Sequence, residues 1–80
     1  MKTVKVEYYA ILREQAGTDA EDVSTASPDA RGLYEELRDR HGFTLAAQDL
    51  RVAIDDAFVD WSTPLEDGAN VVFIAPVAGG

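Results

Sequence analysis

The sequence predicts an α+β domain in which one main helix, over about residues 28–41, packs on a mixed sheet of four to five strands. Residues near the start alternate in polarity, one central stretch has helical periodicity, and residues 71–75 are almost all apolar. Because the two most apolar strands lie at opposite ends of the chain, we expect them to pair at the centre of the sheet. A length of 80 residues suits one domain, placed at residues 1–75, followed by a flexible extended tail at residues 76–80.

The first strand is predicted at residues 2–9, where apolar and polar side chains alternate. One face carries Val4, Val6 and Tyr8, and the other carries Thr3, Lys5, Glu7 and Tyr9. Residues 10–17 contain two apolar side chains among polar ones and end at a glycine, which is typical of one or two helical turns. Residues 20–25 contain one large apolar side chain, Val23, and permit a short edge strand.

The main helix has clear start and stop signals. Ser27 is a preferred N-cap residue, Pro28 suits the first helical position, and Asp29 places negative charge at the positive end of the helix dipole. An apolar face follows at spacings of three and four, formed by Ala30, Leu33, Tyr34, Leu37 and His41. Charged residues occupy the other face, and Gly42 supplies the C-terminal stop. This single helix is expected to cover one face of the sheet.

A hairpin and a final strand are predicted after the helix. Residues 51–55 and 57–61 both alternate in polarity, and the Asp55–Asp56 pair between them is typical of a turn. Residues 62–68 are rich in turn formers. Residues 71–75 are then expected in the middle of the sheet, because strands covered on both faces are apolar throughout.

Charge and composition argue against several classes of protein. The chain has 15 acidic and 7 basic residues, a formal net charge of −8 and no cysteine. This charge disfavours nucleic acids and anionic membranes, and no apolar run approaches the roughly 20 residues of a membrane span. Without cysteine there is no disulfide and no thiolate metal site, and a cytoplasmic location is expected. The acidic surface serves either solubility, including adaptation to salt, or attraction to basic partners.

Side chains that could perform catalysis are few. His41 is the only histidine, and its position in the last helical turn favours an interaction with the helix dipole over proton transfer. The carboxylate pairs are sequence neighbours, which generally point apart: Glu21–Asp22, Glu35–Glu36, Asp55–Asp56 and Glu66–Asp67. No calcium loop, phosphate-binding glycine motif or nucleophile elbow occurs. We therefore expect no catalysis by this chain alone, and no bound cofactor or metal.

The C-terminal segment has an unusual composition. From Gly68 to Gly80 no side chain is charged, although 28% of the residues in the chain are. Pro76 favours an extended chain, so the tail is expected to project from the last strand and to reach roughly 20 Å. Gly79 and Gly80 lack a Cβ, so their backbone can enter a narrow channel and present the terminal carboxylate to a catalyst. Such a carboxylate can be activated as an acyl-adenylate and passed to a nucleophile.

Several short motifs together resemble a known family. They are Tyr8-Tyr9-Ala10, Leu12-Arg13-Glu14 with Gly17, the Pro64-Leu65-x-Asp67-Gly68 turn, and the ending Pro76-Val77-Ala78-Gly79-Gly80. Over its full length the sequence resembles the MoaD family of molybdopterin synthase small subunits, which stands with ThiS among the ubiquitin-like sulfur carriers. The resemblance implies the β-grasp fold.

The resemblance also implies a carrier cycle. A MoeB-like enzyme would use ATP to adenylate the Gly80 carboxylate, and sulfur from a donor protein would replace AMP to leave a thiocarboxylate. The tail residues Pro76, Val77, Ala78 and Gly79 would enter a MoaE-like large subunit, in a complex expected to be a heterotetramer. Sulfur would then pass to cyclic pyranopterin monophosphate and form the dithiolene of molybdopterin. Gly80 is thus the reactive residue, while the catalytic groups belong to the large subunit.

Exposed apolar residues are expected to bind the partner, because stable interfaces have an apolar centre. The alternation leaves Tyr9, Phe58 and Ile74 on the face opposite the core, and these residues match the partner-contact positions of the family. The alternative is that the connector at residues 10–16 covers them, or that they lie singly on the surface. Arg13, next to Glu14, fits a docking role and a structural ion pair equally well.

Three other functions stay open from the sequence. The chain could carry sulfur for thiamine synthesis or tRNA thiolation. It could be a ubiquitin-like modifier that is joined through Gly80 to lysine side chains. It could also be an interaction domain whose terminal glycines are inert.

Overall fold

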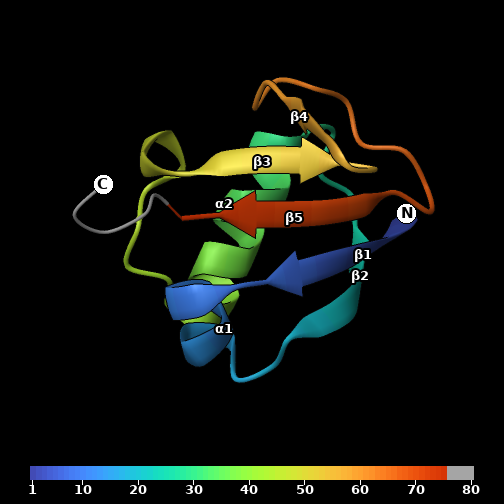
Figure 1. Cartoon of the computed structure of the whole chain (residues 1–80). Coiled ribbons are helices and arrows are strands. Elements are labelled where there is room, and N and C mark those ends of the chain that lie inside the picture. Colours follow the sequence, from blue (N-terminus) through green and yellow to red (C-terminus); the bar gives the residue numbers. More distant parts are fainter. Residues whose placement is uncertain (76–80) are drawn as a thin grey trace.

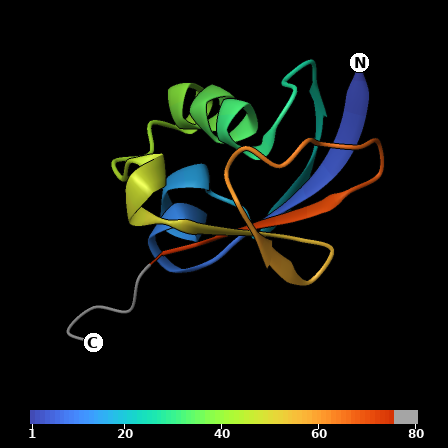
Figure 2. The same ribbon diagram turned by 90° about the horizontal axis from the view of Figure 1, so that it is seen from above.

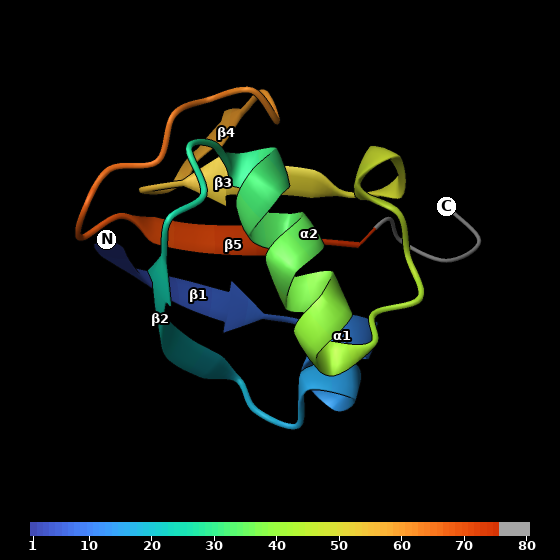
Figure 3. The same ribbon diagram turned by 180° about the vertical axis from the view of Figure 1, so that it is seen from behind.

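The computed structural model describes residues 1–75, and residues 76–80 lie outside the described part. Five strands form one mixed sheet in the order β2-β1-β5-β3-β4 (Figure 1). The elements are, in chain order, β1 (Lys2–Tyr8), α1 (Ala10–Ala16), β2 (Ala20–Thr25), α2 (Ala30–His41), the 3-10 turn η1 (Ala47–Asp49), β3 (Arg51–Ile54), β4 (Ala57–Val59) and β5 (Asn70–Ile74). Figure 2 shows the sheet edge-on with α2 on one side, and Figure 3 shows α2 crossing that face.

The first and last strands lie at the centre of the sheet, as predicted. β1 and β5 are parallel, with Val6 opposite Val71 and Tyr8 opposite Phe73. β3 pairs antiparallel with the other side of β5, and β2 and β4 form the two edges. Because β1 and β5 run in the same direction, their carboxyl ends lie at the same end of the sheet, beside α1 (Figure 1).

One hydrophobic core lies between α2 and the sheet. Tyr34 of α2 is central to it, because its ring centroid lies 5.1 Å from that of Phe73 and 5.8 Å from that of Phe43. The Tyr34 hydroxyl donates a 2.7 Å hydrogen bond to the backbone oxygen of Leu45. The buried cluster consists of Val4, Val6, Tyr8, Leu12, Val23, Ala30, Leu33, Tyr34, Leu37, Phe43, Ala47, Leu50, Val52, Leu65, Ala69, Val71 and Phe73.

The main helix begins at Ala30 rather than at residue 28. Its N-cap is Asp29, whose side chain accepts a 2.8 Å hydrogen bond from the backbone amide of Gly32. The prediction that Ser27 caps the helix is wrong, since its hydroxyl donates instead to the Glu36 carboxylate at 3.2 Å. The C-terminal end follows the prediction, because Gly42 has a left-handed conformation with φ of 74°.

The smaller predicted elements are also present. α1 ends at Gly17, which has φ of 77°, and β2 is an edge strand that pairs with β1 alone. β3 and β4 form the predicted hairpin, with a turn in which Asp55 and Asp56 have φ of 51° and 71°. β4 ends at Val59, so Trp61 lies beyond the strand, where its ring stacks on Phe73 at 5.8 Å.

This arrangement is the ubiquitin-like β-grasp fold, so the predicted fold class is confirmed. Within residues 1–75, no helix has the length and apolar character that a membrane span requires.

Candidate functional site

Helix α2 covers one face of the sheet, and the opposite face carries the predicted docking residues. Residues that pair across neighbouring strands point to the same face. Ala53 pairs with Phe58 of β4 and with Val72 of β5, while Arg51 pairs with Ile74. Because their strand neighbours Val52 and Phe73 belong to the buried core, all five of these side chains point to the other face, which we call the open face.

Tyr9 extends this surface at the carboxyl end of β1. Its backbone is extended, with φ of −130° and ψ of 155°, so its side chain points away from the core that Tyr8 enters. The parallel register of Tyr8 with Phe73 puts Tyr9 next to Ile74. Tyr9 is 52% exposed and Phe58 is 63% exposed, while Ile74 is partly buried. α1 therefore does not cover these residues.

A fourth residue of this surface, Arg51, was missed by the sequence analysis. Its guanidinium carbon lies 5.8 Å from the centroid of the Phe58 ring, which is cation–π geometry. Arg51 thus connects Ile74, its partner in β5, to Phe58 in β4. The strand alternation could have revealed it, because a residue directly before buried Val52 must point to the open face. We call Tyr9, Arg51, Phe58 and Ile74 the open-face patch.

Arg13 lies on α1, at the end of the sheet where β1 and β5 finish (Figure 1). Its Nε lies 3.7 Å from an Asp19 carboxylate oxygen, and both side chains are exposed. An exposed ion pair of this kind contributes at most about 1 kcal/mol. The structural role foreseen for Arg13 is therefore weak, and its docking role stays a prediction.

The predicted reactive segment, Pro76, Val77, Ala78, Gly79 and Gly80, lies outside the described residues. The structure does describe its attachment point. Ala75 is partly buried and packs against the core, so the chain is held in place up to the residue before Pro76. The open-face patch therefore adjoins the position from which the tail continues.

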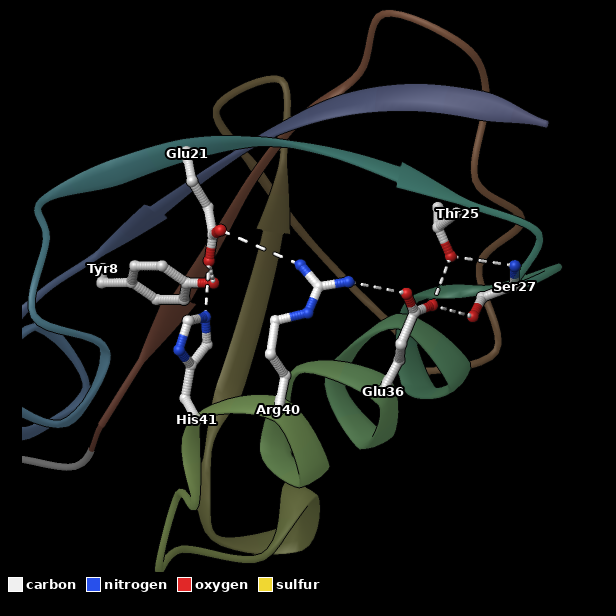
Figure 4. Close-up of polar contacts among 7 residues, drawn as sticks. All are labelled: Tyr8, Glu21, Thr25, Ser27, Glu36, Arg40 and His41. Carbon is white, nitrogen blue, oxygen red and sulfur yellow. Dashed lines mark hydrogen bonds and ion pairs between the residues drawn. The ribbon is translucent and has the colours of Figure 1, made fainter.

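A separate polar network lies on the helix side of the sheet and centres on the Glu21 carboxylate (Figure 4). One of its oxygens accepts hydrogen bonds from the Tyr8 hydroxyl at 2.5 Å and from His41 Nε2 at 2.7 Å. Because a carboxylate only accepts, His41 must carry a proton on Nε2. Arg40 lies 3.9 Å from the other oxygen. Each group in this network has a partner, which indicates a structural role.

The network shifts the pKa values of Tyr8 and Glu21 in opposite directions. Burial, together with the hydrogen bond to the Glu21 carboxylate, raises the pKa of Tyr8 far above its ordinary value. Desolvation by itself would raise the pKa of Glu21. The hydrogen bonds from Tyr8 and His41 and the nearby charges of His41 and Arg40 outweigh that effect, so the pKa of Glu21 is lowered. Glu21 is thus held as a carboxylate near neutral pH.

A second group of polar contacts in Figure 4 connects α2 to strand β2. The Thr25 hydroxyl donates to the Glu36 carboxylate at 2.6 Å, and Ser27 donates to the same oxygen. Arg40 lies 3.4 Å from the other Glu36 oxygen. Glu36, one of the charged residues opposite the apolar face of the helix, therefore links α2 to β2 and is only partly exposed.

No group of three histidine, aspartate or glutamate side chains in residues 1–75 could hold a metal ion. Asp55 and Asp67 line a shallow hollow of about 230 Å³, and both carboxylates accept hydrogen bonds from the backbone. Asp67 accepts from the Thr3 amide and Asp55 from the Asn70 amide. The described chain therefore presents the open-face patch next to the attachment point of the tail.

Comparisons with known proteins agree with this arrangement. The sequence profile of the ThiS family matches residues 6–80. The molybdopterin synthase sulfur carrier subunit of Escherichia coli (strain K12) is 35% identical over 80 residues, which cover 96% of this chain and 99% of that protein. The putative molybdopterin converting factor subunit 1 from Pyrococcus furiosus superposes with a TM-score of 0.82 at 31% identity, covering 96% of this chain and 100% of that one.

A second solved structure contains a complex. It is the protein–protein complex of subunits 1 and 2 of molybdopterin-converting factor from Helicobacter pylori 26695. The matching chain superposes with a TM-score of 0.67 at 23% identity, covering 98% of this chain and 99% of that one. At that identity the likeness shows the fold alone.

Proposed function

Because this chain belongs to the ThiS family, we propose that it is a sulfur carrier, and specifically the small subunit of a molybdopterin synthase. The observation that carries the proposal is the 35% identity to a molybdopterin synthase sulfur carrier subunit over 96% of this chain. The geometry supports it, because the open-face patch adjoins the attachment point of an uncharged tail that ends in two glycines. The tail brings the reactive group to an active site on another protein.

The chemistry of the cycle takes place at Gly80. A MoeB-like activating enzyme uses ATP to convert the Gly80 carboxylate to an acyl-adenylate with release of pyrophosphate. Sulfur from a donor protein then displaces AMP and leaves a thiocarboxylate. Its sulfur keeps a negative charge and a nucleophilic lone pair near neutral pH, so it can attack cyclic pyranopterin monophosphate once the tail lies in the active site. The carrier binds no cofactor in this scheme.

The partner is a MoaE-like large subunit, and two copies of each chain form a heterotetramer. The complex of subunits 1 and 2 from Helicobacter pylori supports a partner of this kind. In the proposed complex Tyr9, Phe58 and Ile74 supply the apolar centre of the interface. Residues Pro76, Val77, Ala78 and Gly79 follow Ala75 into the channel, which needs no charged side chain to be desolvated.

Intact-mass spectrometry tests the carrier step. The purified chain is incubated with ATP, the activating enzyme and a sulfur source, and we expect the mass gain of one oxygen replaced by one sulfur. A chain lacking Gly80 should fold normally and show no gain, because the tail lies outside the core. Absence of the gain in the full chain, with an activating enzyme that is active on another carrier, would refute the proposal.

The same mixture separates the carrier from a protein modifier. A modifier would appear as an amide between Gly80 and a lysine of another protein, detectable by peptide mass spectrometry after digestion. Synthesis of molybdopterin by the thiocarboxylated chain with the purified large subunit identifies the pathway. Sulfur transfer to a thiamine precursor or a tRNA in place of molybdopterin would show that the pathway is different.

A further inference from the structure

Arg51 is the cation of the open-face patch. It begins β3 and pairs with Ile74, the last residue of β5, so it stands beside the point where the chain continues into the tail. Its guanidinium carbon lies 5.8 Å from the centroid of the exposed Phe58 ring, in a cation–π contact between β3 and β4. A shallow hollow of about 290 Å³ lies beside it, lined by Arg51, Phe58, Val59 and Asp60.

Contact with the Phe58 ring does not satisfy the hydrogen-bond donors of Arg51. A guanidinium carries five N–H donors in one plane, and a ring face satisfies none of them as a carboxylate would. Within residues 1–75, the Arg51 side chain forms no ion pair and no hydrogen bond. Asp60 lines the same hollow, but the two side chains form no ion pair.

Docking of a protein on the patch would remove water from these donors. A desolvated guanidinium without an acceptor costs far more than a surface ion pair contributes, so an interface that covers Arg51 must supply one. The planar guanidinium is best matched by the two oxygens of a carboxylate. We infer that the protein receiving the tail places an aspartate or glutamate side chain against Arg51, and that this pair sets the orientation of docking. The inference rests on the proposed function.

The overall charge of the chain makes such a pair useful. With a net charge of −8, the chain is attracted to any basic surface, and this long-range attraction fixes no single orientation. A cation within an apolar patch rejects partners that offer only apolar or basic groups there, because its donors would stay unpaired. A carboxylate opposite Arg51 therefore aligns the patch, and with it the start of the tail, with the entrance of the channel.

Binding of the purified large subunit by the thiocarboxylated or unmodified full chain tests this inference. We expect Arg51→Gln to raise the Kd by about tenfold or more, in the range seen when one partner of a covered charge pair is removed. Arg31→Gln is the matched control, because it removes the same charge from an exposed arginine. Arg31 lies on α2, on the other side of the sheet. Asp60→Asn is expected to leave the Kd unchanged, since the acceptor comes from the partner.

Carbodiimide cross-linking identifies the acceptor. The Arg51→Lys variant places an amine at this position, which carbodiimide joins to a nearby carboxylate as an amide with loss of water. We expect a cross-link to an aspartate or glutamate of the large subunit that the wild-type chain and Arg31→Lys do not form.

The outcomes separate the inference from the proposed function. If the wild-type chain does not bind the large subunit, the proposed function fails and this inference fails with it. If the wild-type chain binds and the Kd of Arg51→Gln is no higher than the Kd of Arg31→Gln, the inference is overturned. The proposed function then still stands. The inference is likewise overturned if Asp60→Asn weakens binding as much as Arg51→Gln, or if the Arg51→Lys cross-link does not form.

Discussion

Tyr8 and Tyr9 show how one position in a strand decides what a side chain does. Tyr8 is 1% exposed, and its hydroxyl donates to the Glu21 carboxylate. Tyr9, the next residue, is 52% exposed and lies beside Ile74 on the open face. Because neighbouring side chains in an extended chain point to opposite faces, identical residues here serve the core and the surface.

Glu21 should contribute stability that depends on pH. Its pKa is lowered in the folded state, so the stabilisation is present above its unfolded pKa of about 4.3 and is lost as the pH falls through the folded value. We expect Glu21→Gln to lower the free energy of unfolding by about 1–2 kcal/mol at pH 7 through weaker hydrogen bonds from Tyr8 and His41. Urea denaturation from pH 7 to pH 3 measures the difference, which should shrink on acidification.

Asp22→Asn provides the control for this experiment. Asp22 is the exposed neighbour of Glu21 in β2 and points to the opposite face. Its substitution should change stability little at any pH. A Glu21→Gln deficit that stays constant down to pH 3 would contradict the role given to the ionised carboxylate.

Ile74 should be essential for docking but not for folding. It lies on the open face and is absent from the buried cluster, so Ile74→Glu should leave the unfolding midpoint nearly unchanged. We expect the same substitution to weaken binding of the large subunit at least about tenfold, because it replaces an apolar contact at the centre of the interface with a charge and competes for Arg51 with the carboxylate of the partner. Titration calorimetry and circular dichroism measure the two effects.

Ser24→Glu is the matched substitution, since Ser24 is exposed on the edge strand β2, away from the patch. It should bind the large subunit like the wild-type chain. Equal losses in the two variants would mean that added negative charge, and not the patch, governs binding.

The turn of the β3–β4 hairpin requires a left-handed backbone conformation that its two aspartates adopt at a steric cost. Asp55 and Asp56 both have positive φ, which glycine adopts without steric cost. Asp55 has a second role, because its carboxylate accepts a 3.0 Å hydrogen bond from the Asn70 amide. Asp56 has no such contact among the recorded bonds of residues 1–75, so it is the position to change.

Asp56→Gly should stabilise the protein by about 0.5 kcal/mol, because relief of the left-handed strain exceeds the added freedom of the unfolded chain. Chemical denaturation at neutral pH gives the change in the free energy of unfolding. Asp60→Gly is the control, since Asp60 lies in the same region without a positive φ and should lose stability. A loss of stability in Asp56→Gly would show that the turn is unstrained.

The start of α2 shows where local signals in a sequence compete. Both Ser27 and Asp29 are good N-cap residues, and the sequence alone favours the earlier one because Pro28 follows it. The tertiary structure decides for Asp29. The backbone oxygen of Pro28 accepts a hydrogen bond from the Leu65 amide, and Asp29 forms a bridge with Pro64, so this segment is held extended by a distant part of the chain.

At the scale of the whole molecule, the excess of acidic residues should make stability depend on salt. A net charge of −8 on a small chain produces self-repulsion, which is greater in the compact state. Raising KCl from 0.1 to 1 M shortens the Debye length from about 10 to about 3 Å, so the urea midpoint should rise.

A variant with four exposed carboxylates neutralised tests the cause. The substitutions are Asp22→Asn, Glu35→Gln, Asp39→Asn and Glu66→Gln, all at exposed positions. This variant should gain less from salt than the wild-type chain does. An equal gain would mean that salt acts through something other than charge repulsion.

The helices and strands of this protein, and the character of its C-terminal segment, could be predicted from local patterns. Alternation in residues 2–9, the helical spacing from Ala30 to Leu37 and the charge-free stretch from Gly68 onward depend only on neighbouring residues, so they can be recognised without a structure. The pairing of the terminal strands was also predicted, because both are strongly apolar.

Contacts between side chains that are distant in the chain could not be predicted in this way. Arg51 reaches Phe58 and stands beside Ile74 because β3 lies between β4 and β5, and no local pattern encodes that strand order. Glu21 forms hydrogen bonds with Tyr8 and His41 because the edge strand β2 and the end of α2 lie close together in the folded chain. Such contacts join residues that are far apart in the chain, and they form only once the apolar faces of the sheet and the helix have packed together.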